Sequence, residues 1–175
     1  MKGKLVKYGV FSTAMCDVGV VASSKGIVEI RLQCPLAAKL AGDIEKNGYY
    51  AVPYEKGDAI IEDAVGQLTE YFEGSRRKFD VPLDWRVGGF RKKVLGIVKR
   101  IPYGKTLTYG EVARRAGNAD AARAVGGAVG ANPLPLVVPC HRVIAAGNKP
   151  GGFGGGLELK AELLKLEGLD YGWDI

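Results

Sequence analysis

The spacing of apolar residues changes character near residue 84, and this change constrains the fold more than any other feature of the sequence. Before it, three short runs of β-branched and apolar residues are separated by turn residues and predict a small antiparallel sheet. These runs cover residues 5–11, 18–22 and 27–32. Helical spacing follows at 36–46 and at 59–72, where Asp58 is placed to cap the first turn.

The stretch 76–84 contains Pro82 and has no clear periodicity, so we expect it to link two domains. We place an α/β scaffold domain in residues 1–83 and a second domain in residues 84–175. No apolar run approaches the ~20 residues that span a membrane. The N-terminus has charge but no apolar core of a signal peptide, so we expect the protein to stay where it is made.

Short helices dominate the second half. Apolar residues from Phe90 to Ile101 share one face of a helix that Pro102 stops. Residues 108–111 read Thr-Tyr-Gly-Glu, which has the form of a capping box, and we expect a helix from there to Ala116.

After a break at Gly117, a second helix is expected over 120–131, and a last one over 157–167. Two short helices split by a tight glycine turn are typical of a helix-turn-helix. The sequence therefore predicts an α+β protein, with a sheet and helices first and a mostly helical domain with a helix-turn-helix second.

The second helix of this pair consists almost entirely of small residues from Ala121 to Ala131 and contains three glycines. Each glycine costs a helix about 1 kcal/mol relative to alanine. Such a cost is usually offset by close approach of the backbone to another surface. That surface is either a neighbouring helix or a narrow DNA groove, into which Arg123 would project as the one long side chain.

The net charge is unevenly distributed along the chain. Residues 1–83 carry 11 Lys/Arg and 11 Asp/Glu, which sum to zero, whereas residues 84–175 carry 14 and 8, which leaves the whole +6. A basic domain beside a neutral one is typical of binding to an anionic partner. A solvated basic surface without a partner has the same composition.

Cys140 is followed directly by His141 and preceded by an apolar run at 136–138 that suggests a buried, strand-like segment. An ordinary thiol has a pKa near 8.5, so a nucleophilic cysteine needs a base or a cation nearby. His141 fills that role directly or through a water if the chain turns here. The alternative is a small buried hydrophobe, the commoner role for an arbitrary cysteine.

The other two cysteines, Cys16 and Cys34, form no C-x-x-C pair with Cys140. An odd, low count argues against a disulfide framework and for a reducing compartment. A structural zinc site needs about four ligands. The distant cysteines and the single histidine do not supply them convincingly, so we expect no metal.

Three strings in the second half carry a resemblance to a known family. They are Ile-Pro-Tyr-Gly-Lys-Thr-Leu-Thr-Tyr-Gly-Glu-Val-Ala at 101–113, Ala-Ala-Arg-Ala-Val-Gly-Gly-Ala at 121–128 and Val-Pro-Cys-His-Arg-Val-Ile at 138–144. With Asn132 and Pro133 between them, they resemble the O6-alkylguanine-DNA alkyltransferases, also called methylated-DNA–protein-cysteine methyltransferases. The resemblance covers 84–168 strongly and 1–83 only in general layout. It implies a ribonuclease H-like first domain and a winged-helix-like second one.

The resemblance also implies a reaction, in which the protein flips O6-alkylguanine out of duplex DNA and moves the alkyl group irreversibly onto Cys140 without a cofactor. His141 would take the thiol proton through a water, and Glu167 would orient the histidine. Asn132 would hold the turn before the acceptor, and Tyr109 would donate a proton to guanine N3. Without the resemblance, Glu167 would be interpreted as a surface charge that closes the last helix.

The implied partner is double-stranded DNA, approached from the minor groove by a monomer. Arg123 would fill the gap that the flipped nucleotide leaves. The other expected DNA contacts are Thr108, Ala122, Gly126, Arg114 and Arg115, with phosphates also near Arg91, Lys92 and Lys93. Arg114 and Arg115 are equally explained as solvent-facing helix charges.

The implied substrate pocket is formed by Tyr109, Val143, Phe153 and Gly154. Its loop departs from the family pattern, because Phe153 keeps an aromatic ring without a hydroxyl and Gly154 replaces a polar residue, commonly serine. A glycine-rich lid should be flexible, so we expect tolerance of alkyl groups larger than methyl.

Two other classes of protein compete with this interpretation. One is a lesion-binding protein of the same fold that transfers nothing, but the family's relatives of that kind replace the acceptor cysteine that is present here as Cys140. The other is a cysteine hydrolase, which does not arrange its pair as sequence neighbours. The thiols and the missing signal peptide predict the cytoplasm, or the nucleus in a eukaryote.

Overall fold

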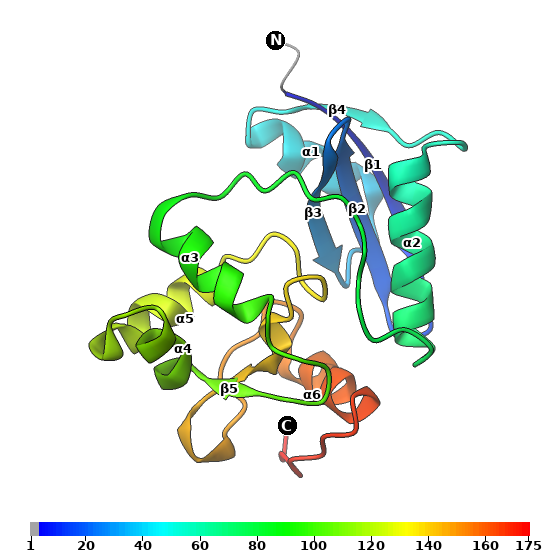
Figure 1. The fold of residues 1–175 in the computed structure, drawn as a ribbon. Helices are drawn as coiled ribbons and strands as arrows, with labels where there is room; N and C mark the ends of the chain where they lie inside the picture. Colours follow the sequence, from blue (N-terminus) through cyan, green and yellow to red (C-terminus); the bar gives the residue numbers. More distant parts are fainter. Residues whose placement is uncertain (1–3) are drawn as a thin grey trace. The chain divides into compact units, whose positions relative to one another are not determined.

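The computed structural model describes residues 4–175, and the chain divides into two compact units, Met1–Arg86 and Val87–Ile175 (Figure 1). The division lies three residues beyond the junction expected after residue 83. The reason is that the end of the linker pairs with the first unit. Ile27 N donates to Pro82 O at 2.8 Å, and Asp84 N donates to Ile27 O at 2.9 Å.

The first unit is built on a four-stranded sheet in the order β3-β2-β1-β4. Its strands are β1 (Leu5–Ser12), β2 (Asp17–Ser23), β3 (Gly26–Leu32) and β4 (Tyr50–Pro53). The first three pair antiparallel, as expected, but β4 pairs parallel with β1, so the sheet is mixed. The sequence analysis missed β4 because a strand of four residues at a sheet edge shows too little alternation to detect.

Two helices cover this sheet. They are α1 (Ala37–Lys46) and α2 (Ala59–Phe72). Helix α1 contacts β1 and β4, and α2 contacts β2 and β3. Every residue of β2 from Val18 to Ala22 is buried, which requires cover on both faces of the sheet. The expected cap of α2 is confirmed, since Asp58 Oδ1 accepts a hydrogen bond from Ile61 N at 3.2 Å.

The second unit is mostly helical (Figure 1). Its elements are α3 (Gly89–Val98), β5 (Leu107–Thr108), α4 (Tyr109–Arg115), η1 (Ala119–Ala121), α5 (Ala122–Gly130), η2 (Cys140–Arg142), β6 (Val143–Ile144), η3 (Ala146–Asn148) and α6 (Leu157–Leu166). Helices α3, α4 and α5 pack on one another, and the short strands β5 and β6 pair in parallel.

The expected helix-turn-helix consists of α4 and α5, and its capping box is confirmed. Thr108 Oγ1 accepts from Glu111 N at 3.2 Å, and Glu111 Oε2 accepts from Thr108 N at 2.7 Å. The chain leaves α4 through Gly117 at φ +86°, a left-handed conformation that glycine adopts without strain. The expected bounds were slightly too long, because Ala116 caps α4 and a 3-10 turn precedes α5.

Two local predictions are wrong. Phe90 does not join the buried face of α3 but is 41% exposed in its first turn, and Ile101 lies beyond the end of that helix. The segment 136–138 is buried but is not a strand. It forms tight turns in which Leu136 has φ +71° and Cys140 N donates to Val138 O at 2.7 Å.

Over residues 4–175, no helix is both long and apolar enough to span a bilayer. Within the same described part of the chain, no group of three or more His, Cys, Asp and Glu side chains is placed to hold a metal ion.

We predict that Asp58→Ala lowers the free energy of unfolding of the first unit by about 1–2 kcal/mol. The substitution removes the cap of α2 and a 2.9 Å ion pair with Lys7. Urea denaturation followed by circular dichroism measures the change. Glu55→Ala, at an exposed neighbouring position, should change the stability by no more than about 0.5 kcal/mol. Equal effects of the two substitutions would contradict the capping role.

Candidate active site

The local fold ties the segment that carries Cys140 to the start of the helix-turn-helix. Strand β6 follows η2 directly and pairs with β5, with Val143 opposite Leu107 and Ile144 opposite Thr108. Because Thr108 is also the N-cap of α4, this short ladder fixes η2 relative to the first turn of α4. Cys140, the first residue of η2, is 7% exposed.

Asn132 holds the turn before Cys140. Its Nδ2 donates to Val138 O at 2.8 Å, and its Oδ1 accepts from Leu134 N at 3.0 Å. Burial raises the pKa of the Cys140 thiol, and a hydrogen bond with Asn132 opposes that shift in part. The resting cysteine is therefore a neutral thiol, and a reaction at its sulfur requires a base.

The nearest base in sequence, His141, is fully buried and is held by Glu167. The His141 Nε2 and Glu167 Oε1 atoms lie 3.0 Å apart, and both side chains are inaccessible to solvent. Burial lowers the pKa of His141, and Glu167 opposes that shift. The imidazole is thus neutral at neutral pH. In the tautomer whose Nε2–H donates to Glu167, Nδ1 carries a lone pair and is able to accept a second proton.

Arg142 completes this cluster, and the sequence analysis did not assign it a role. Its Nε and Nη2 donate to the Glu167 carboxylate at 2.9 and 2.7 Å, and its Nη1 donates to Ile101 O at 2.6 Å. Gly104 N also donates to Glu167 Oε2, at 3.1 Å. The structure therefore places Glu167 inside the unit as a shared acceptor, and the interpretation of this residue as a surface charge is wrong.

Tyr109 lies at the first position of α4, where its ring meets the loop after β6. Its hydroxyl donates to Gly152 O at 3.4 Å. A Cβ added at Gly151 would lie 2.8 Å from the ring, so only glycine lets the loop approach this closely. Burial raises the pKa of the phenol, which therefore stays protonated and able to donate.

The other expected pocket residues are divided between core and surface. Val143 is fully buried, and the Phe153 ring lies edge-on to the His141 ring with 6.4 Å between centroids. Gly154 is exposed, and a Cβ added there would meet no atom within 4 Å. Space is therefore open at Gly154 itself, whereas Gly151 packs against Tyr109 and Gly155 against Phe153 and Leu159. The flexibility of the loop stays a prediction.

A second residue that sequence reasoning missed is Lys160, whose side chain is completely buried. Its Nζ donates to Val143 O at 2.6 Å and to Pro150 O at 2.5 Å. The signal that could have found it is its position on α6, one turn before the buried Leu163 and Leu164, where an apolar residue is the normal choice.

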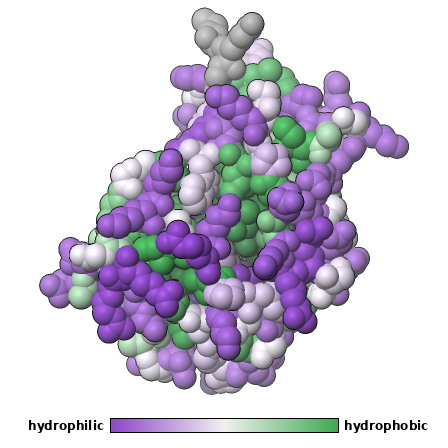
Figure 2. Space-filling model, in the orientation of Figure 1, coloured by the Kyte–Doolittle hydropathy of each residue, from purple (hydrophilic) through white to green (hydrophobic). Residues whose placement is uncertain are grey.

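The expected DNA contacts lie on the helix-turn-helix and on α3. Arg123 is exposed on α5, beside the half-buried Ala122 and Gly126. The Thr108 hydroxyl is occupied in the capping box. The remaining basic candidates, all exposed, are Arg91, Lys92, Lys93, Arg114 and Arg115. Hydrophilic side chains gather over the region of α4 on the face shown in Figure 2. Within residues 4–175 none of these basic groups forms an ion pair, so their charges are available to an external anion.

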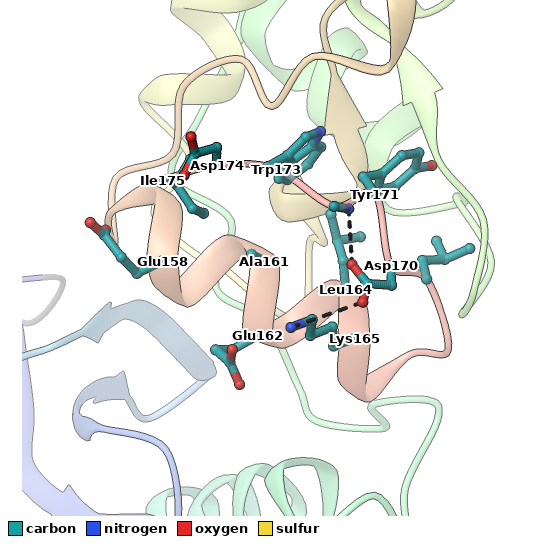
Figure 3. Close-up of a pocket in the computed structure, with 12 residues that line it drawn as sticks. Glu158, Ala161, Glu162, Leu164, Lys165, Asp170, Tyr171, Trp173, Asp174 and Ile175 are labelled. Carbon is teal, nitrogen blue, oxygen red and sulfur yellow. Dashed lines mark hydrogen bonds and ion pairs between the residues drawn. The ribbon is translucent and has the colours of Figure 1, made fainter.

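A separate hollow of about 510 Å³ lies between α6 and the last residues of the chain (Figure 3). The rings of Tyr171 and Trp173, which stack at 5.1 Å, form part of its wall. Neither Cys140 nor His141 lines it, so it is separate from the cysteine–histidine site.

Comparison with protein families matches both halves of the chain. Residues 6–85 match the model for the 6-O-methylguanine DNA methyltransferase ribonuclease-like domain, and residues 89–169 match the DNA binding domain of the same protein. The fold and the cysteine site thus define one class of protein, and the chain belongs to the 6-O-methylguanine DNA methyltransferase family. The expected α+β class and the resemblance are confirmed.

Individual relatives agree with this assignment. The chain is 45% identical over 142 residues to a methylated-DNA–protein-cysteine methyltransferase of Methanosarcina acetivorans, covering 74% of this chain and 90% of that protein. It is 52% identical over 104 residues to the protein of that name from Mycolicibacterium paratuberculosis, covering 59% of this chain and 63% of that protein, less than two thirds of its length.

Solved structures agree as well. The O6-methylguanine methyltransferase of Mycobacterium tuberculosis superposes with a TM-score of 0.77 at 35% identity, covering 93% of this chain and 92% of that chain. A structure of the M. tuberculosis protein in complex with DNA gives a TM-score of 0.78 at 34% identity, with the same coverage.

We predict that His141 titrates below its ordinary pKa of about 6.5. The chain has one histidine, so the imidazole C–H signals in an NMR titration of the untagged protein belong to His141 alone. Glu167→Gln should lower the midpoint further, because the carboxylate is the group that raises this pKa. Glu162→Gln, at an exposed site on the same helix, should leave it unchanged. A wild-type midpoint at or above 6.5 contradicts the predicted lowering of the pKa.

Proposed function

We propose that this protein repairs O6-alkylguanine in double-stranded DNA by transferring the alkyl group irreversibly to its own Cys140. The observation that carries the proposal is a buried cysteine followed by a neutral histidine, which a buried carboxylate orients. The names of the relatives support the reaction, and the DNA complex of the M. tuberculosis protein supports the partner.

The proposed transfer is a displacement at carbon. His141 accepts the thiol proton through a water, and the Cys140 sulfur attacks the alkyl carbon. The sulfur–carbon bond forms while the bond from that carbon to O6 breaks, and guanine leaves with the electron pair. Tyr109 donates a proton to guanine N3, which makes the base a better leaving group. The proton that His141 received then returns to the Tyr109 oxygen through solvent, so the protons balance.

The base must leave the stack before this chemistry begins, because O6 lies inside the duplex. Flipping costs a few kcal/mol. In the proposed complex Arg123, exposed on α5, fills the space in the stack, and the small residues Ala122 and Gly126 let the helix lie close to the minor groove. The unpaired basic side chains of α3 and α4 bind phosphates without sequence preference, which suits a protein that searches for lesions.

The product is a thioether, and no group in the proposed site can hydrolyse it. Each protein molecule therefore repairs one lesion. The reaction needs no cofactor, because thiol, base and proton donor are all side chains of this chain. It needs a free thiol, which persists in a reducing compartment, and we propose that the protein acts in the cytoplasm, or in the nucleus of a eukaryote.

The alternative is a protein of the same fold that binds the lesion without transfer. The presence of Cys140 beside a base favours transfer, because a binding protein has no use for a nucleophile at this position. We therefore rank the transferase first.

Incubation with duplex DNA that contains one O6-methylguanine should add a single methyl group to the protein, located on the Cys140 peptide by mass spectrometry. The yield should saturate at one methyl per molecule. Cys140→Ser should abolish the mass change and still bind the DNA, since it leaves the binding surface unaltered. Cys34→Ser, at a buried thiol of the first unit, serves as the control and should react fully. Binding by the wild-type protein without a mass change would favour the lesion-binding alternative.

We predict that O6-benzylguanine in DNA reacts within about tenfold of the rate of O6-methylguanine, because a flexible lid discriminates weakly between alkyl groups. The open surroundings of Gly154 accommodate a serine side chain. Gly154→Ser should stiffen the loop and slow the benzyl reaction more than the methyl one. The test measures the second-order rate constants for the two substrates on the same duplex sequence. A benzyl rate far below the methyl rate contradicts the prediction.

A further inference from the structure

The segment that follows α6 carries two aromatic residues, Tyr171 and Trp173, to which the proposed function assigns no role. Their rings stack with 5.1 Å between centroids and 9° between planes (Figure 3). Both side chains are half-buried, and the hollow of about 510 Å³ lies between this segment and α6. The two rings therefore depend for their position on contacts other than close packing against α6.

Each of the two side chains forms a hydrogen bond with a different loop. The Tyr171 hydroxyl and Thr106 Oγ1 lie 2.7 Å apart, and Trp173 Nε1 donates to Asn148 O at 2.6 Å. Thr106 and Asn148 are far apart in the sequence. The stacked pair thus forms a bridge between two loops, with one hydrogen bond at each end.

Both loops lead directly to the candidate active site. Thr106 stands just before β5, whose last residue, Thr108, caps the helix that begins with Tyr109. Asn148 ends η3, and the loop after it carries Phe153, whose ring lies edge-on to the ring of the catalytic candidate histidine. The bridge therefore connects the segment that carries Tyr109 with the segment that carries Phe153.

The backbone at Asn148 gives the bridge a further purpose. Asn148 has φ +58° and follows Gly147 at φ +68°. This left-handed conformation is uncommon for a residue with a side chain, although asparagine tolerates it better than most. Ala145 N donates to Lys149 O at 2.9 Å and closes the turn. The hydrogen bond from Trp173 adds a contact from outside the turn, which holds the strained conformation and with it the start of the loop.

We propose that Tyr171 and Trp173 are positioning residues that form a strap across these two loops, and that the strap determines which alkyl groups are transferred efficiently to Cys140. The inference rests on the proposed function, because it concerns the alkyl range of the same reaction. The strap acts through the loops that carry Tyr109 and Phe153, and not by contact with the alkyl group.

Loss of the strap has opposite consequences for small and large alkyl groups. A loop that is no longer held at Asn148 orients a methyl group less well, and misplacement of reacting groups slows transfer. The same loop leaves more room for a benzyl group, which partly or fully offsets that loss. Affinity for DNA should not change, because the proposed phosphate contacts lie on α3 and α4.

The test compares Trp173→Phe, which keeps a ring but removes the N–H donor, with Tyr171→Phe, which keeps a ring but removes the hydroxyl. Asp174→Ala, at an exposed position of the same segment, is the control. Single-turnover transfer from DNA with O6-methylguanine or O6-benzylguanine gives the limiting rates and the Kd of each protein, and thermal unfolding monitors the fold.

Each strap variant should lower the limiting rate of methyl transfer by about threefold or more. The ratio of the benzyl rate to the methyl rate should rise by about threefold or more, with Kd changed less than about twofold. The control should match the wild-type protein in all three quantities. A merely structural role would reduce the active fraction and lower both rates together, which leaves their ratio unchanged.

Amide hydrogen exchange provides a readout that does not depend on activity. Peptides that cover residues 145–156 should exchange faster in both strap variants than in the wild-type protein, whereas peptides from α5 should exchange at the wild-type rate. Either variant is sufficient for the comparison if the other does not fold.

A wild-type ratio of benzyl to methyl transfer in the folded variants, or unchanged exchange at 145–156, overturns the strap while transfer to Cys140 stands. Absence of transfer of both groups by the wild-type protein overturns the proposed function instead.

Discussion

The interaction on which the second unit depends is the buried carboxylate of Glu167. It accepts hydrogen bonds from the Arg142 guanidinium and from Gly104 N, and it contacts His141 Nε2. Glu167 is also the C-cap of α6, where the helix dipole disfavours a negative charge. The positive charge of Arg142 offsets this unfavourable interaction with the helix dipole. Removal of one partner from a buried ion pair of this kind costs about 3–5 kcal/mol. The carboxylate thus joins the end of α6, the 3-10 turn η2 and the loop before β5.

Burial and the charges of this cluster together set the protonation state of the histidine. A carboxylate alone beside a buried imidazole raises its pKa and tends to make it a cation, which cannot accept a proton from a thiol. Here burial is the largest effect and lowers the pKa of His141, and the charges of Arg142 and Lys160 lower it further against the opposing effect of Glu167. The carboxylate is therefore able to orient the ring without charging it. Structural stability and the basicity of the histidine have a common origin in one cluster of charges.

Local sequence signals predicted most of the fold and little of the site. Capping at Asp58 and Thr108 depends on neighbours within three residues, and both caps are present. The contacts of Glu167 with His141 and Arg142 join residues 26 and 25 positions apart. No periodicity encodes such contacts, and only the family resemblance led from Glu167 to the histidine. Lys160 was overlooked because its carbonyl partners, 17 and 10 residues away, are backbone groups without a sequence signature.

The burial of Cys140 has a chemical consequence under the proposed function, in which each molecule reacts once. A permanently ionised thiolate would be consumed by oxidants and by stray electrophiles, since the thiolate is the reactive form. Burial raises the pKa of Cys140 and keeps the sulfur neutral at rest, while Asn132 and Lys160 act in the opposite sense. Because burial is the largest of these effects, the pKa of Cys140 stays above its ordinary value and the sulfur ionises only when a base takes its proton. In the proposed transfer, a neutral and already oriented His141 takes the thiol proton once substrate is bound, so the nucleophile would form only when the alkyl carbon is there to receive it.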